Sequence, residues 1–232
     1  MRDSFPDPRA IPNYGIPEAA HYLRMPVTTL RAWLIGQDYQ TMRGTKRFRP
    51  IIKLAQRKPP LLSFINLVEA HVLDAIRHEH GVPLQTVRRA LDYVIREFGI
   101  EHPLARQQFE TDGVNLFIQR LYQLINVSEE GQLAIRELLA THLRRIEHDE
   151  VGLALRLFPF TRPSHLDQPK TIVIDPHMSF GRPVLSGTGI ATIMIAERYA
   201  AGDSIALLAD DYGRHSSEIE EAVRCELRLE TV

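Results

Sequence analysis

The chain is poor in the features that define several large protein classes. Its 232 residues include a single cysteine, Cys225, which excludes an internal disulfide framework and a cysteine-rich zinc module. No run of about 18 apolar residues occurs, so the sequence predicts no membrane span. The first ten residues lack the apolar core of a secretory signal, and we therefore expect a cytoplasmic protein. With 44% hydrophobic and 25% charged residues, the composition is typical of a globular protein and excludes collagen-like and disordered chains.

The net charge of −1 hides an uneven distribution of charged residues. Residues 1–100 carry a net charge of +6, residues 101–163 carry −2, and residues 164–232 carry −5. A basic front half suits a polyanion such as nucleic acid. An acidic tail suits a basic protein surface, so we expect the two ends to have different partners.

Proline positions and apolar patterns divide the chain into four parts. The predicted parts are a flexible arm (1–12), a DNA-binding domain (13–100), a mixed α/β middle segment (101–163) that packs and dimerises, and a small helical domain (164–232). The predicted fold class is therefore mainly α with small β elements.

Two short helices joined by a three-residue turn form a helix-turn-helix candidate near the N-terminus. Pro17 fits the first position of one helix, where its missing N–H is not needed. The second helix is predicted from about Val27 to Ile35, with apolar residues three and four positions apart. Such a helix can enter the major groove of DNA. The side chains expected to meet bases and phosphates are Thr28, Thr29, Arg31 and Trp33.

A β-hairpin with its tip near Gly44 is predicted after these helices, as in a winged helix. Between Arg24 and Lys58 the sequence has nine lysines and arginines and one acidic residue, Asp38. DNA phosphates would supply the missing counter-charge. The other interpretation of this pattern is a helical hairpin with a solvated, charged face. The predicted phosphate-binding residues of the wing are Arg43, Lys46, Arg47 and Arg49.

The remaining elements of the front half and the middle are predicted from apolar spacing and turn residues. Asn66 and Glu69 form a plausible capping pair for a helix, and Asp112-Gly113 indicates a hairpin. The predicted strands cover 51–54, 61–64, 121–127 and 151–158, the predicted helices cover 67–79, 83–98 and 129–148, and a linker covers 158–163.

The last part is predicted to contain a strand, a loop rich in glycine and proline, and three helices. Ser204 is a plausible N-cap, and so is either Ser216 or Ser217, with Ser217 pairing with Glu220. The predicted ranges are 171–174 for the strand, 175–189 for the loop, and about 191–201, 204–212 and 216–228 for the helices.

The N-terminal part resembles the MerR-like winged-helix family. The motifs that carry the resemblance are Ile16-Pro17-Glu18-Ala19-Ala20, Tyr22-Leu23, Pro26-Val27-Thr28-Thr29-Leu30-Arg31-Ala32-Trp33, Leu62-Ser63-Phe64, Val72-Leu73-Asp74-Ala75-Ile76-Arg77, and the stretch from Gly81 to Leu91. The resemblance implies a homodimer that binds a near-palindromic operator. The sequence lacks the long C-terminal dimerisation helix and the cysteine effector site of typical members.

The C-terminal part resembles a small domain of unknown function that recurs in VapB-type antitoxins. The motifs are Ile174-Asp175-Pro176, Phe180-Gly181-Arg182-Pro183-Val184, Gly187-Thr188-Gly189-Ile190, Ala201-Gly202-Asp203-Ser204-Ile205 and Leu208-Ala209-Asp210-Asp211-Tyr212. That domain usually has arginine at the position of Gly189. The resemblance implies a compact helical domain, often encoded beside a toxin with a PIN-type ribonuclease fold. We expect partner contacts at Arg182, Glu218 and Glu221, although an acidic helix face is more often merely solvated.

The sequence predicts no catalytic site, cofactor or metal. The glycine loop lacks the spacing of a P-loop or a dinucleotide fingerprint, and the histidines form no helical metal-binding pattern. The pair Asp210-Asp211 has no neighbouring base or nucleophile. We therefore expect a binding protein and not an enzyme.

The expected function is that of a type II antitoxin that neutralises a VapC-like, PIN-domain ribonuclease and binds operator DNA. One alternative is a stand-alone transcription regulator whose middle segment binds a small effector. Another is an interaction protein whose winged helix has lost DNA binding, but the basic wing disfavours it.

Overall fold

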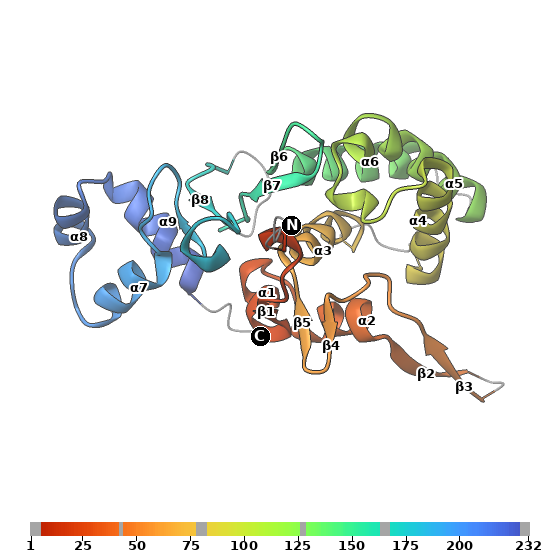
Figure 1. Ribbon diagram of the computed structural model, residues 1–232, viewed down its shortest axis with the longest axis horizontal. Helices are drawn as coiled ribbons and strands as arrows, with labels where there is room; N and C mark the ends of the chain where they lie inside the picture. The colour runs from red at the N-terminus through yellow and green to blue at the C-terminus, as the bar shows by residue number, and fades with distance from the viewer. Residues whose placement is uncertain (1–5, 42–43, 78–82, 126–128, 163–167, 228–232) are drawn as a thin grey trace, which may run out of the picture.

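The computed structural model describes residues 6–41, 44–77, 83–125, 129–162 and 168–227. These residues are mainly helical with small sheets, as the sequence predicts. Figure 1 shows an elongated molecule in which the last three helices lie to one side of a larger unit. We refer to residues 168–227 as the C-terminal unit.

The helix-turn-helix is formed by α1 (Ile16–Tyr22) and α2 (Val27–Ile35). Arg24 takes a left-handed backbone conformation, with φ of 52°, at the turn between them. The helices bury Ala19, Ala20 and Leu30 against each other and against the main core. A small antiparallel sheet in the order β1-β5-β4 (Tyr14–Gly15, Pro60–Leu62 and Gln56–Arg57) completes this unit.

The predicted basic hairpin is present as β2 (Gln37–Thr41) and β3 (Gly44–Phe48), which form a separate two-stranded sheet. Gly36 adapts the end of α2 to this hairpin, since it has φ of +84° and a Cβ there would lie 2.3 Å from the Phe48 carbonyl oxygen. The predicted strand at 51–54 is wrong. Residues Ile51 and Ile52 instead donate their N–H groups to the carbonyl oxygen of Trp33, at 2.7 and 3.1 Å, and so tie the hairpin base to α2.

Two further helices, α3 (Phe64–Arg77) and α4 (Leu84–Phe98), follow as predicted. Gly99 ends α4 in a left-handed conformation, which confirms its expected role as a C-cap. The Asn66–Glu69 pair forms inside α3 and does not cap it. The Asn66 side chain instead accepts from Ala55 N–H at 2.9 Å and donates to the Lys53 carbonyl at 3.0 Å, so it fixes the preceding loop.

The middle segment is more helical than predicted. Asp112-Gly113 lies in a helical turn, Phe109–Gly113, that runs into α5 (Val114–Ile125), so the predicted hairpin and the strand from Leu121 are wrong. Phe109, Phe117 and Leu121 are buried, and their helical spacing outweighs the local turn signal. After α6 (Glu129–Leu143) comes a hairpin of β6 (Ile146–His148) and β7 (Ala154–Leu157). The predicted helix therefore ends five residues early, and Ile146 lies on a strand.

One continuous cluster of buried side chains extends from Tyr14 to Ile174. It joins the helix-turn-helix to α3–α6, so residues 13–100 and 101–163 share a core. A second, smaller cluster extends from Ile172 to Cys225 and belongs to the C-terminal unit.

The C-terminal unit contains β8 (Ile172–Val173), β9 (Val184–Leu185), α7 (Thr192–Ala200), α8 (Ile205–Tyr212) and α9 (Ser216–Glu226). All three helices are where the sequence predicts them. Ser204 caps α8 by accepting from Leu207 N–H, as expected. The predicted Ser217–Glu220 cap is wrong, because the N-cap of α9 is His215, two residues earlier, and Glu218 accepts from His215 N–H at 3.0 Å.

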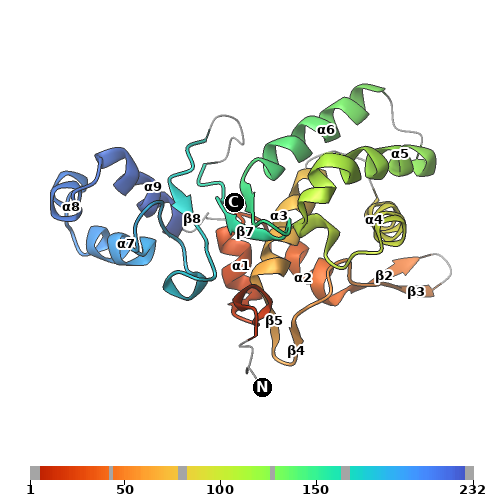
Figure 2. The same cartoon turned by 45° about the horizontal axis from the view of Figure 1, so that its top comes forward.

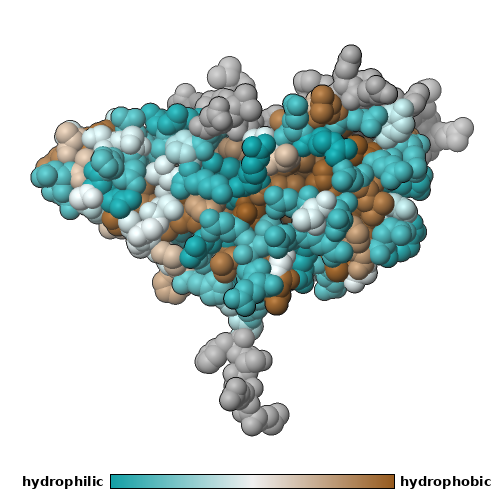
Figure 3. Space-filling view, turned by 90° about the horizontal axis from the view of Figure 1, so that it is seen from above, coloured by the Kyte–Doolittle hydropathy of each residue, from teal (hydrophilic) through white to brown (hydrophobic). Residues whose placement is uncertain are grey.

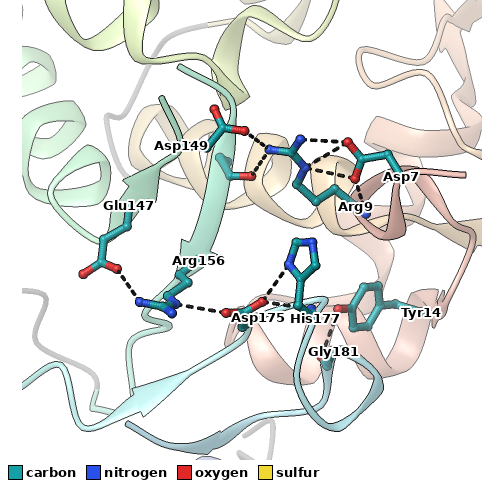
Figure 4. A network of polar contacts seen from close by, with 10 residues as sticks. Asp7, Arg9, Tyr14, Glu147, Asp149, Arg156, Asp175, His177 and Gly181 are labelled. Carbon is teal, nitrogen blue, oxygen red and sulfur yellow. Dashed lines mark hydrogen bonds and ion pairs between the residues drawn. The ribbon is translucent and has the colours of Figure 1, made fainter. Parts of the chain in front are cut away.

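Residues 6–12, predicted as part of a flexible arm, are anchored instead. Arg9 bonds both Asp7 and, at 2.5 Å, Asp149 beside β7 (Figure 4). This contact ties the N-terminal segment to the middle of the chain.

The loop between β8 and β9 packs directly on β1 and α1 (Figure 4). Tyr14 donates its hydroxyl to the Gly181 carbonyl at 2.9 Å, and Arg182 forms an ion pair with Glu18. Burial raises the pKa of Tyr14, so its hydroxyl stays protonated as a donor. Gly181 has φ of +74°, and a Cβ there would lie 2.3 Å from the Tyr14 hydroxyl oxygen.

We predict that Gly181→Ala destabilises the protein more than Gly187→Ala. Gly187 has the same φ of +74° but no atom within 4 Å of an added Cβ, so it isolates the backbone cost. That cost is about 1 kcal/mol, and the clash with Tyr14 adds roughly 1–3 kcal/mol. Urea unfolding of both variants measures the difference. Equal losses in the two variants would show that the close approach to Tyr14 is unimportant.

Candidate nucleic-acid interface

The outer face of α2 carries the polar residues expected to read DNA. Thr28 and Arg31 are exposed and Thr29 is half-buried. Pro26 precedes the helix and has no side-chain oxygen to bond the first-turn N–H groups, so these can meet phosphate oxygens. Trp33 does not belong to this set. Its side chain is only 1% exposed and packs in the main core, so the expectation that it contacts bases is wrong.

The β2–β3 hairpin presents the predicted wing residues that the structure describes. Arg47 and Arg49 are both exposed. Arg47 lies opposite Asp38 and is 3.6 Å from its carboxylate, with both side chains at least 60% exposed, so solvent screens this ion pair strongly. Lys46 lies on β3, but its side chain and all of Arg43 fall outside the described residues.

A second basic hairpin, β4–β5, was not among the predicted site residues. Arg57 and Lys58 are exposed there, and like Arg49 they form no ion pair with any described residue. The sequence did hold the signal, because no acidic residue occurs between Asp38 and Glu69. Figure 1 shows α2 between the two hairpins. The arrangement places positive charge on both sides of α2, a helix of the kind that enters the major groove of DNA.

The predicted partner-binding residues of the C-terminal unit are engaged within the chain. Glu221 is 1% exposed and bonds Thr161, Arg162 and Arg224, so the expectation that it faces a partner is wrong. Glu218 caps α9 and pairs with Arg214. Arg182 pairs with Glu18 of α1.

Two arginines anchor the chain where the larger unit meets the C-terminal unit. Arg24 donates to the carbonyls of Thr161 and Arg224, at 2.7 and 3.1 Å. Arg145 bonds four carbonyls on both sides of residues 163–167, those of Phe158, Pro159, Gln168 and Pro169. Burial lowers the pKa of Arg145 to about 10, so it stays charged at neutral pH.

Metal binding and thiol reactivity have no support among the described residues. No group of three His, Cys, Asp or Glu side chains among them is placed to hold a metal ion. Burial raises the pKa of Cys225, which keeps the thiol protonated and unreactive. None of the described helices is both long enough and apolar enough to cross a bilayer.

Comparisons with known proteins match both ends of the chain. Residues 12–91 match a family described as "Putative DNA-binding HTH domain", and residues 172–224 match a family described as "Protein of unknown function". The "Putative antitoxin VapB45" of Mycobacterium tuberculosis is 29% identical over 92% of this chain and 93% of its own length. The chain is thus similar to this relative over nearly its whole length.

Two further similar proteins come from the same organism. The uncharacterized protein Rv2308 is 24% identical over 90% of this chain and 88% of its own length. The crystal structure of Rv2018 superposes with a TM-score of 0.65 at 25% identity, covering 92% of this chain and 98% of that one. The similarity in each case includes both the helix-turn-helix and the C-terminal unit.

We predict that Glu221→Gln destabilises the C-terminal unit by about 2–3 kcal/mol, because it leaves Arg162 and Arg224 without their shared charge. Glu220→Gln is the matched control. Glu220 also pairs with Arg224, but it is 46% exposed and should contribute about 0–1 kcal/mol. Chemical denaturation at pH 7 compares the two variants.

The same carboxylate gives a pH dependence. Burial alone would raise the pKa of Glu221, but the Thr161 hydrogen bond and the two arginines outweigh burial and hold the pKa below its ordinary 4.5. Its stabilisation is therefore present above pH 4.5 and disappears as the pH falls below that value. The free energy of unfolding should fall less steeply there in Glu221→Gln, and parallel curves would contradict the assignment.

Proposed function

We propose that this chain is the antitoxin of a type II toxin-antitoxin pair. It binds operator DNA through α2 and the basic hairpins, and it binds a PIN-domain ribonuclease toxin through its C-terminal unit. The observation that carries the proposal is the VapB homology, which extends over 92% of the chain and so includes both units. On this proposal the chain acts by binding and not by catalysis, as a cytoplasmic homodimer on a near-palindromic operator.

The charge distribution supports two separate partners. Arg49, Arg57 and Lys58 are exposed around α2 without carboxylate partners among the described residues. In the C-terminal unit every described arginine is ion-paired, namely Arg182, Arg198, Arg214 and Arg224. The exposed Glu197 and Asp210 form no ion pair with described residues, which leaves that unit with unpaired negative charge. A ribonuclease that holds RNA phosphates has a basic surface, which such a unit could cover.

The DNA-binding part predicts two kinds of mutational effect. Arg49→Ala should weaken binding about equally on all DNA sequences and reduce the salt slope by about one, since one phosphate is no longer neutralised. Arg31→Ala or Thr28→Ala should instead change the ranking of operator variants, at about 1–3 kcal/mol for each base that the helix no longer bonds. Fluorescence anisotropy across a salt series measures both effects.

Arg144→Ala is the control for the DNA experiment. Arg144 is an exposed arginine just after α6. Figure 1 shows α6 at the top and the β2–β3 hairpin at the bottom, so Arg144→Ala should leave DNA binding unchanged. An unchanged salt slope in Arg49→Ala would count against the hairpin contact. An unchanged operator ranking in the α2 variants would count against α2 as the reading helix.

The toxin part is tested by co-expression with the product of the neighbouring reading frame. We expect that product to arrest growth alone, growth to recover when this chain is present, and the two proteins to purify as one complex. A neighbour that is harmless alone and does not co-purify would overturn the antitoxin proposal. Operator binding that then changed with a metabolite would favour the stand-alone regulator instead.

A further inference from the structure

Phe180 is the most exposed large hydrophobic side chain among the described residues, at 89%. It lies in the loop between β8 and β9, in the same short turn as Gly181. An aromatic ring in water stabilises nothing by burial in the free chain, so its position requires another explanation.

The backbone that presents this ring is conformationally unfavourable. Ser179, Phe180 and Gly181 have φ values of 46°, 54° and 74°, so three consecutive residues are left-handed and two of them carry a Cβ. Residues with a Cβ disfavour this region, and such strain persists only where the surrounding structure enforces it.

The enforcing contacts come mainly from the helix-turn-helix unit. Asn13 donates its side-chain amide to the Phe180 carbonyl at 2.6 Å, and Tyr14 donates to the next carbonyl at 2.9 Å. Within the loop, Arg182 N–H bonds the Ser179 carbonyl at 3.0 Å. These contacts hold the carbonyls against β1 while the ring stays in solvent, so the backbone that carries the ring is ordered before any partner arrives.

An exposed aromatic side chain on an ordered backbone has the properties of a protein-binding anchor. Aromatic residues are enriched among the few that dominate interface energetics, and pre-ordering the backbone lowers the entropic cost of association. The charge of the C-terminal unit as a whole indicates the class of partner. Its exposed carboxylates on α7 and α8, Glu197 and Asp210, form no ion pair with described residues, whereas its described arginines are all paired. Figure 3 shows its surface, at the left, as largely hydrophilic. The partner should therefore offer an apolar pocket on a basic surface.

We propose that Phe180 is the anchor by which this chain binds the ribonuclease toxin, with its ring inserted in an apolar pocket rimmed by basic residues. This proposal rests on the proposed function and names the side chain that contacts the toxin. The toxin would then bind beside α1 of the helix-turn-helix and not on the acidic face of α9.

The test compares Phe180→Gly and Phe180→Ala with Tyr199→Ala in the full chain. Glycine suits the left-handed backbone, so Phe180→Gly should fold with an unchanged or higher melting temperature. We expect both Phe180 variants to bind the purified toxin at least tenfold more weakly and to lose growth rescue in the co-expression assay. Tyr199, an aromatic of α7 that is 44% exposed, is the control and should change affinity less than twofold.

The outcomes separate the two proposals. If the wild-type chain fails to bind the toxin, both proposals fall. If it binds and the Phe180 variants bind equally well, or if Tyr199→Ala loses as much affinity, only the anchor assignment falls. Loss of operator affinity in Phe180→Gly, or loss of self-association of the free chain in sedimentation, would also overturn it, because the ring would then serve DNA or a second copy.

Discussion

The contact between the β8–β9 loop and β1 is the constraint on which the arrangement of the two units depends. The Gly181 backbone comes so close to the Tyr14 hydroxyl that no Cβ fits between them, and the Arg182–Glu18 ion pair lies beside it. Arg24 bonds Thr161 and Arg224 from the turn of the helix-turn-helix. Figure 2 shows the result: the C-terminal unit lies against α1, and the β2–β3 hairpin lies on the far side of α2. The proposed DNA-binding and partner-binding surfaces are thereby kept apart on one framework.

Charge is separated along the same framework. Arg49, Arg57 and Lys58 remain without carboxylate partners among the described residues, whereas the described arginines of the C-terminal unit are all paired with carboxylates of this chain. Unpaired charge on a surface contributes little to folding but strongly to the encounter with an oppositely charged partner. The molecule thus offers positive charge where a polyanion would dock, and negative charge at the end proposed to bind a protein.

Sequence patterns predicted the elements whose signals are local. The spacing of Val27, Leu30 and Leu34 and the glycines at 36 and 99 gave the helix positions, because apolar period and left-handed caps are properties of neighbouring residues. Asp112-Gly113 misled, because buried phenylalanines on either side favoured a helix. Trp33 and Glu221 were misassigned for a related reason. Their partners, the main core and Arg162, are distant in sequence, so residue type alone could not show that one is core and the other an internal ion pair.

Arg24 satisfies two unrelated requirements at once. Its backbone makes the left-handed turn that sets the angle between α1 and α2, and its guanidinium bonds the carbonyl of Arg224 in α9. A glycine would make that turn with less strain but would release the C-terminal helix, and a lysine would keep a charge without the forked geometry that reaches two carbonyls. A substitution at this position therefore cannot alter the helix-turn-helix without also affecting the C-terminal unit. Any change in the geometry of the α1–α2 turn would also change how α9 is held.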